Sequence, residues 1–205
     1  MRRGHLFSIL AAFGLLAAAT GAQASTGGNT SVAVQPGATG PSVGAVTPGA
    51  FSAVTLNGQD QAIYASLGSY EVTDATGSGA GWKVTFQASR FACTAGTDKC
   101  PAGTGDTLAA GLLKVAKPTA ACATGNGCQG RAAAPTGGIS TATAIDGSSA
   151  VTVLSAAAGS GMGKYTVTPG AFNSDPNKNL ELQLPAYAYA ATYTSTLTID
   201  ISTGP

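Results

Sequence analysis

The most informative stretch of the sequence is Gly77-Ser78-Gly79-Ala80-Gly81-Trp82-Lys83-Val84-Thr85-Phe86-Gln87-Ala88. From Trp82 onward, apolar and polar residues alternate, and this period of two is typical of a β-strand with one buried face. The glycines before Trp82 give the backbone the freedom that a tight turn needs. Trp82 is the only tryptophan of the chain. Its place at the start of the strand therefore predicts a core anchor.

Alternation also occurs on the other side of the glycines, so the sequence predicts a central hairpin of strand, glycine-rich turn and strand over residues 70–89. Asn57-Gly58 is a second hairpin signal. Similar segments follow one another between turns rich in Gly, Asn, Asp and Pro. We predict further strands over residues 31–34, 51–56, 61–65, 106–115, 139–145, 151–154, 165–168, 180–184 and 193–201. A short helix is the alternative for residues 106–115, where Gly111 and Pro118 favour a strand.

The regular spacing of these segments, without a convincing amphipathic helix, indicates an all-β protein. We predict an antiparallel β-sandwich with Greek-key-like connections and a cysteine-containing loop excursion. Its two sheets would close over the apolar side chains of the central and C-terminal strands, namely Trp82, Val84, Phe86, Leu182, Leu184, Leu197, Ile199 and Ile201.

The N-terminus has the pattern of a secretory signal peptide. Arg2 and Arg3 give a basic start, residues 6–19 are apolar, and Ala22-Gln23-Ala24 fits the small-x-small cleavage rule. The apolar run is short for a membrane span. We therefore predict a signal peptide over residues 1–24 and a secreted, extracellular protein that begins at Ser25.

Composition divides the remaining chain into a lead-in and one domain. Residues 25–48 are rich in Gly, Pro and Thr and contain a candidate first strand at residues 31–34. Residues 49–205 are the predicted β-sandwich domain, and residues 92–136 within it are a predicted disulfide-containing insertion.

Charge and histidine content narrow the classes of function. Only 9% of the residues are charged and no basic run exists, so nucleic acid is not an expected partner. The single histidine, His5, lies in the predicted leader. Histidine triads and histidine-ligated metal sites are thus excluded from the mature chain. Because the acidic residues are scattered, we predict no enzyme activity, no cofactor and no metal.

All four cysteines lie within the predicted insertion, and secretion favours disulfides. Four cysteines permit three pairings. We favour Cys93 with Cys100 and Cys122 with Cys128, because each pair brackets a short loop rich in glycine or threonine. The nested pairing, Cys93 with Cys128 and Cys100 with Cys122, is the alternative. A bridge that closes so short a loop contributes roughly 2–3 kcal/mol in the chain-entropy model.

One loop has oxygen ligands at alternate positions, as calcium loops do: Asn173, Asp175, Asn177 and Asn179. However, Lys178 stands where such a loop needs its turn glycine, and Leu184 where it needs its bidentate acid. Asp175-Pro176-Asn177 is also an ordinary turn sequence. We therefore favour a turn here.

Two parts of the chain carry a family resemblance. Tyr70-Glu71-Val72-Thr73-Asp74 with the stretch from Gly77 to Val84 resembles the first signature of WxL domains. The stretches 156–165 and 184–201 resemble the second signature. The chain departs from the family pattern in two places. Val84 replaces a leucine in Trp82-Lys83-Val84, and Ile199-Asp200-Ile201 lacks the tryptophan.

WxL domains are surface modules of Gram-positive bacteria that hold to the cell wall without a covalent link. The resemblance thus implies a non-enzymatic protein that binds peptidoglycan. The alternative that it implies is a structural or adhesive subunit that acts through a WxL-interacting surface protein. Suspected wall contacts are the motif residues and nearby aromatic side chains: Trp82, Lys83, Val84, Tyr187, Tyr189, Tyr193, Ile199, Asp200 and Ile201.

Overall fold

The computed structural model describes residues 31–103, 105–125 and 130–205. The chain divides into two units, Met1–Val34 and Gln35–Pro205. In the first unit, the described residues 31–34 are exposed and have no regular secondary structure. The predicted signal peptide, residues 1–24, lies outside the described residues.

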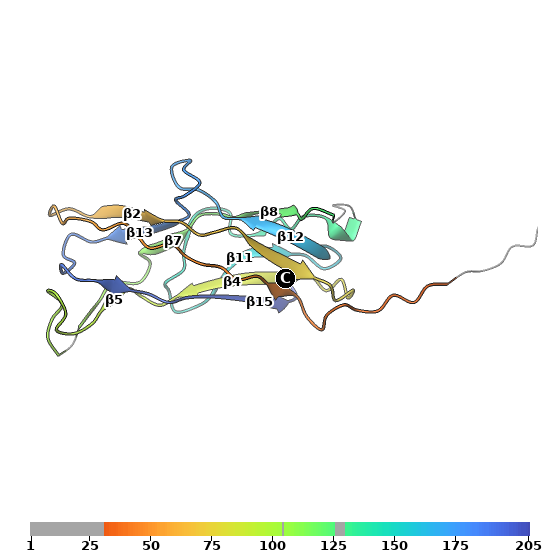
Figure 1. Ribbon diagram of the computed structural model, residues 1–205, viewed down its shortest axis with the longest axis horizontal. Coiled ribbons are helices and arrows are strands. Elements are labelled where there is room, and N and C mark those ends of the chain that lie inside the picture. The colour runs from red at the N-terminus through yellow and green to blue at the C-terminus, as the bar shows by residue number, and fades with distance from the viewer. Residues whose placement is uncertain (1–30, 104, 126–129) are drawn as a thin grey trace, which may run out of the picture. The chain divides into compact units, whose positions relative to one another are not determined.

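The second unit is all-β and antiparallel, as predicted, and its strands form four sheets in two layers (Figure 1). Two sheets lie end to end in one layer, because β2 runs on into β3 and β7 into β8 after short breaks. Their strands are, in spatial order, β1 (Ser42–Val43), β3 (Tyr70–Asp74), β12 (Gly163–Thr168) and β8 (Thr119–Cys122), then β10 (Thr143–Ala144), β7 (Leu113–Val115), β13 (Leu180–Leu184) and β2 (Gln61–Ala65).

The opposite layer is built in the same way, because β4 leads into β5 and β14 into β15. Its strands are, in spatial order, β15 (Leu197–Thr203), β4 (Trp82–Ala88), β11 (Val151–Ala156) and β9 (Gly137–Gly138), then β14 (Tyr193–Thr194), β5 (Ala92–Cys93) and β6 (Asp106–Thr107). Among the sheet neighbours, only β5 and β6 are consecutive in sequence. The other connections cross between sheets, as Greek-key-like connections do. The described residues also include one short 3₁₀ helix, Gly130–Ala132.

The core lies between the layers and follows the predicted alternation. Trp82, Val84 and Phe86 on β4 are at most 1% exposed. Leu182 and Leu184 on β13 are also buried. The other predicted core residues, Leu197, Ile199 and Ile201, are half-buried, since β15 is an edge strand of its sheet.

Trp82 has a specific partner in addition to apolar packing. Its indole N–H donates a hydrogen bond of 2.8 Å to the carbonyl oxygen of Gly161, and its ring lies 6.1 Å from that of Tyr165. Gly161 has a φ of +76°, and a Cβ there would collide with the Cβ of Ala156 and lie 2.8 Å from the indole nitrogen. Only glycine permits this close approach without strain.

The predicted central hairpin is wrong. β3 and β4 belong to different sheets, and the loop over residues 75–81 carries the chain from one layer to the other. Both strands bury alternate side chains in the same core, so they pack face to face instead of pairing edge to edge. Tyr70 on β3 and Phe86 on β4 meet across that core, with ring centroids 6.2 Å apart.

Several other strand predictions need correction. Residues 31–34 form no strand, and the first strand is β1, later in the lead-in. Residues 106–115, 139–145 and 193–201 are interrupted and contain only the shorter strands β6, β7, β10, β14 and β15. In the first of these segments, Gly111 turns the chain with a φ of +88°, and its N–H is bonded to the buried Asp146.

The largest local difference from prediction concerns residues 48–56, which we call the strap. The strap includes the predicted strand 51–56, but this segment joins no sheet. Its hydrogen bonds to β2 and to the residues just after β2 lie near its two ends only. The N–H of Gly49 donates to the carbonyl of Ser66 (2.8 Å), and the Gln61 side chain donates to the carbonyl of Thr55 (3.1 Å). The turn at Asn57-Gly58 exists, with a positive φ at Gly58, but it connects the strap to β2 rather than two paired strands.

The contact between Trp82 and Gly161 generates a stability prediction. We expect Gly161→Ala to destabilise the protein by about 1–3 kcal/mol more than Gly159→Ala, because only the first places a methyl group against the Ala156 side chain and the indole. Gly159 is a matched control, since its φ of +80° is similar but a Cβ there meets nothing within 4 Å. Urea unfolding followed by Trp82 fluorescence measures both free energies. Equal losses would show that the indole does not require the glycine.

Candidate functional site

The residues suspected of wall contact fall into two groups. The first comprises the two family motifs, which lie side by side because β4 pairs with β15 along its full length. Val84 is opposite Ile201, and Trp82 is opposite Thr203. Trp82 and Val84 are fully buried, so neither side chain reaches the surface in the folded domain. The polar residues of the motifs are Lys83, which is half-buried, and Asp200, which is exposed.

The second group comprises Tyr187, Tyr189 and Tyr193. They belong to residues 185–193, which we call the tyrosine loop and which joins β13 to β14. Tyr187 is 72% exposed and Tyr189 is 47% exposed. Tyr193 lies ten residues before Thr203, the partner of Trp82, which corresponds to about 30 Å along extended strands. The structure therefore brings the tyrosines together but keeps them away from the paired segments 82–84 and 199–201, although they belong to the stretch 184–201 that resembles the second signature.

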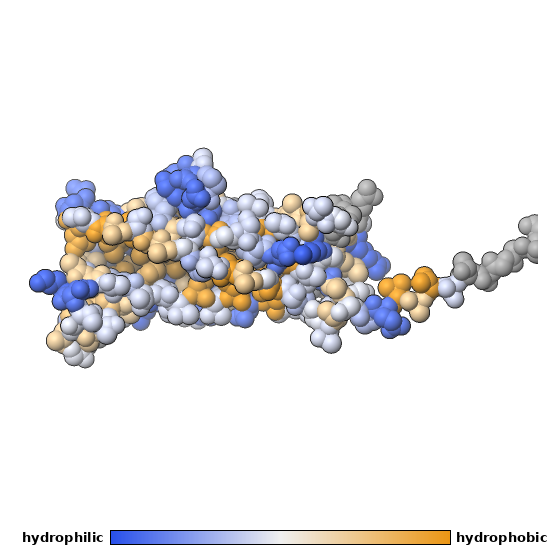
Figure 2. Space-filling model, viewed as in Figure 1, coloured by the Kyte–Doolittle hydropathy of each residue, from blue (hydrophilic) through white to orange (hydrophobic). Residues whose placement is uncertain are grey.

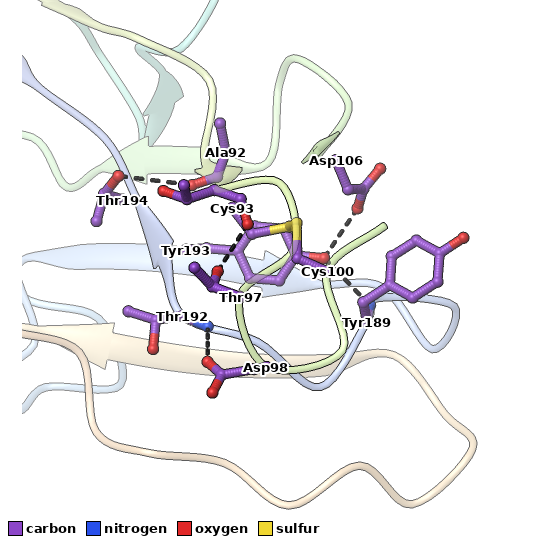
Figure 3. The surroundings of a disulfide bond; sticks show 11 residues. Ala92, Cys93, Thr97, Asp98, Cys100, Asp106, Tyr189, Thr192, Tyr193 and Thr194 are labelled. Atoms are coloured by element: carbon purple, nitrogen blue, oxygen red, sulfur yellow. Dashed lines mark hydrogen bonds between the residues drawn. A yellow bond between two sulfur atoms is a disulfide. The ribbon is translucent and has the colours of Figure 1, made fainter. Parts of the chain in front are cut away.

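The tyrosine loop is held in place by the chain segments around it (Figure 3). Ala186 N–H donates to the Asp60 carboxylate (2.8 Å). Thr192 N–H donates to the Asp98 carboxylate (3.3 Å), as Figure 3 shows. Lys99 N–H donates to the Ala190 carbonyl (3.1 Å). Ala188 is buried beneath the loop between the two exposed tyrosines. The loop thus presents Tyr187 and Tyr189 from a supported backbone.

A disulfide supports the neighbouring loop. Cys93 is bonded to Cys100, which confirms the first predicted sequence-neighbour pair and excludes the nested pairing. This bridge encloses Asp98 and Lys99, which contact the tyrosine loop. Cys128 lies outside the described residues, so its pairing with Cys122 stays a prediction. The predicted insertion, residues 92–136, also contributes β5 to β8 to the sheets.

Tyr193 connects the tyrosine loop to β6, the strand that carries Asp106. Its hydroxyl donates to the Asp106 carboxylate (2.8 Å) and accepts from the Tyr189 N–H (3.1 Å), as Figure 3 shows. Burial, together with the nearby Asp106 carboxylate, raises the pKa of Tyr193 to about 12. Tyr193 is therefore neutral at physiological pH and serves as a support, whereas the Tyr189 ring points away from the disulfide.

An apolar cleft of about 1160 Å³ adjoins the tyrosine loop. It lies between the strap and the inward faces of the two layers, and sequence reasoning missed it because the strap reads as an ordinary strand. Hydrophobic residues are visible on the surface over this end of the domain (Figure 2). Among the described residues that line the cleft, Asp98 is the only charged one. Its walls include Phe51, Phe91, Leu180, Leu182, Leu184 and Tyr189.

The asparagine-rich loop behaves as a turn rather than as an evident cation site. Asn179 donates to the carbonyls of Gly170 and Pro176 and accepts from the Leu67 N–H. The Asn177 N–H, and then Lys178, lower the pKa of Asp175. Within the described ranges, no three His, Cys, Asp or Glu side chains gather as metal ligands. Over residues 31–103, 105–125 and 130–205, no helix has the length and apolarity that a membrane span needs.

Comparison with known proteins gives one match. A family model described as "WxL domain surface cell wall-binding" matches residues 26–205. No curated protein and no solved structure matches the chain.

The raised pKa of Tyr193 generates a prediction about alkaline stability. Between the ordinary tyrosine pKa of 10.0 and about 12, the unfolded chain loses a proton that the folded chain retains. This contribution is fully present below pH 10 and is lost as the pH rises through the folded pKa. We therefore expect the unfolding free energy of the wild type to fall more steeply above pH 10 than that of Tyr193→Phe. Parallel curves from urea unfolding at each pH would contradict the assignment.

Proposed function

The chain belongs to the WxL family of surface cell wall-binding domains, and from that premise we propose that it attaches to peptidoglycan through the tyrosine loop, without a covalent bond. Association with the cell wall is the property of the family. The polymer, the non-covalent mode and the contact residues are our proposals.

The exposure of Tyr187 and Tyr189 on a supported loop carries this proposal. An aromatic ring offers an apolar face to the C–H groups of a sugar ring, and its hydroxyl can form hydrogen bonds at the edge. Because neighbouring segments hold the loop backbone, little conformational entropy is lost on binding. The low charge of the chain suits such a contact, which does not depend on ion pairs.

The motif residues have a different role in this proposal. Trp82 and Val84 are buried, and Ile199 and Ile201 are half-buried beside them, so these four side chains maintain the sandwich. Lys83 and Asp200 are the polar motif residues that a wall component could contact at a second surface. We propose that Tyr187 and Tyr189 contribute more, because they are exposed and offer aromatic faces to sugar rings, which Lys83 and Asp200 lack.

We also propose that the protein is non-enzymatic and is secreted after removal of residues 1–24. The sequence has no histidine after His5. Two buried carboxylates are already engaged with the backbone. Asp146 accepts from the N–H groups of residues 111–113, and Asp74 accepts from the Thr76 N–H. These bonds support a structural role for both acids.

A protein partner is the second candidate, and the edge strands favour it. β15 is seven residues long, and its sheet pairing is with β4 alone. Such an edge can accept an added strand from another protein. A WxL-interacting surface protein that docks in this way would bring the domain to the wall indirectly.

Co-sedimentation with purified, protein-free peptidoglycan tests the proposed contact. We expect the wild type to be retained and the double variant Tyr187→Ala/Tyr189→Ala to bind up to about tenfold more weakly per ring removed. Tyr64→Ala is the matched control, because Tyr64 is a tyrosine of β2 that contacts Phe172 and Lys178 away from the tyrosine loop. It should bind as the wild type does.

Two results would contradict the proposal. If the folded wild type does not sediment with peptidoglycan, attachment must depend on a partner. If it sediments and the double variant binds equally well, the contact lies elsewhere, and Lys83→Ala and Asp200→Ala would be tested next.

A further inference from the structure

Two apolar features of the chain are left unexplained by the proposed wall contact, although Tyr189 also lines the second of them. The first is the segment Ser31-Val32-Ala33-Val34, which we call the arm. Val32 and Val34 are 85% and 86% exposed, more than any other large hydrophobic residue of the described chain. The arm has the alternation of a strand, yet it pairs with none. No charged residue occurs between Ser25 and Asp60. Burial of the arm therefore removes no charge from water, and burial of its valines is favourable.

The second feature is the apolar cleft beneath the strap. Leu180, Leu182 and Leu184 contribute to one wall, and Phe51 packs edge to face on Phe91 with 5.7 Å between ring centroids. A sugar is a poor occupant of this interior, because its hydroxyl groups would lose hydrogen bonds to water against leucine walls. An apolar side chain meets no such penalty.

The strap also offers unpaired backbone beside the cleft. Between residues 50 and 54, no backbone N–H or C=O of the strap is hydrogen-bonded to another part of the described chain. An extended peptide can therefore pair with the strap and place every second side chain toward the cleft. Val32 and Val34 have this spacing.

We propose that the arm of one copy binds along the strap of a second copy and inserts Val32 and Val34 into its apolar cleft. In this contact the exposed valines of the arm fill the apolar cleft, and the backbone of the arm forms hydrogen bonds with the backbone of the strap. Arm and cleft are different surfaces, so the contact is heterologous and each copy can accept one neighbour and donate to another. The result is a chain of domains. This inference does not depend on wall attachment.

Sedimentation velocity of the full chain over a concentration series tests the proposal. We expect the average mass of the wild type to rise beyond that of a dimer with concentration. Val32→Asp/Val34→Asp should associate at least about tenfold more weakly per valine replaced. Ala53→Trp should also weaken association, because Ala53 is exposed at the cleft and an indole there occupies it. The control Ala158→Trp places the same ring on an exposed turn outside the cleft and should behave as the wild type.

Mixing the two defective variants gives the sharpest test. The arm variant retains an open cleft, and Ala53→Trp retains an intact arm. We expect each variant alone to stay monomeric and the mixture to form a one-to-one dimer that does not grow. Circular dichroism verifies that both variants are folded.

Three results would overturn the proposal. These are a wild type that is monomeric at every concentration, an arm variant that associates as the wild type does, or a mixture that forms no dimer. Peptidoglycan binding is measured separately with the arm variant and should be unchanged, because neither Val32 nor Val34 belongs to the proposed wall contact. A failure of the wall contact is therefore distinguishable from a failure of self-association.

Discussion

The indole N–H of Trp82 donates to the Gly161 carbonyl from a position with no solvent exposure, and this contact joins the parts of the sandwich. Gly161 lies in the connection from β11 to β12, which belong to sheets in opposite layers. Residues 75–81 make the equivalent crossing from β3 to β4, and the two connections are joined by the bond from Gly159 N–H to the Gly79 carbonyl. Trp82 therefore stabilises the place where two connections, β3 to β4 and β11 to β12, pass from one layer to the other.

The two connections near Trp82 hold the layers together at one end of the domain. The opposite end is available for binding. There the disulfide loop, the tyrosine loop and the strap meet around an apolar cleft. The strap has few backbone hydrogen bonds, and the tyrosine loop is supported mainly by single bonds to Asp60, Asp98 and Lys99. The paired segments 82–84 and 199–201 thus help to give the protein its fold, and loops at the other end of the domain supply the proposed contact surfaces. The missing tryptophan of the second motif removes no proposed contact, because Ile199 and Ile201 lie in the sheet beside β4.

Local periodicity was sufficient to predict the strands at residues 61–65 and 180–184 and the burial of Trp82, Val84 and Phe86. It could not predict which strands pair, because alternation specifies a buried face and leaves the neighbours of the strand open. For this reason the predicted pairing of β3 with β4 is wrong. The predicted strand over residues 51–56 is wrong because the apolar residues of the strap face a cleft between the layers, which gives the same sequence pattern as a strand in a sheet. The Cys93–Cys100 pair was predictable, since both cysteines bracket one short loop.

Fluorescence of the sole tryptophan, excited at a wavelength that tyrosine does not absorb, tests the central claim most directly, because the signal then comes from Trp82 alone. If Trp82 joins the layers from inside the core, its emission lies at short wavelength, iodide does not quench it, and added peptidoglycan changes neither property. Emission at the wavelength of free indole, with iodide quenching that peptidoglycan prevents, would contradict this claim and place Trp82 at the wall contact instead.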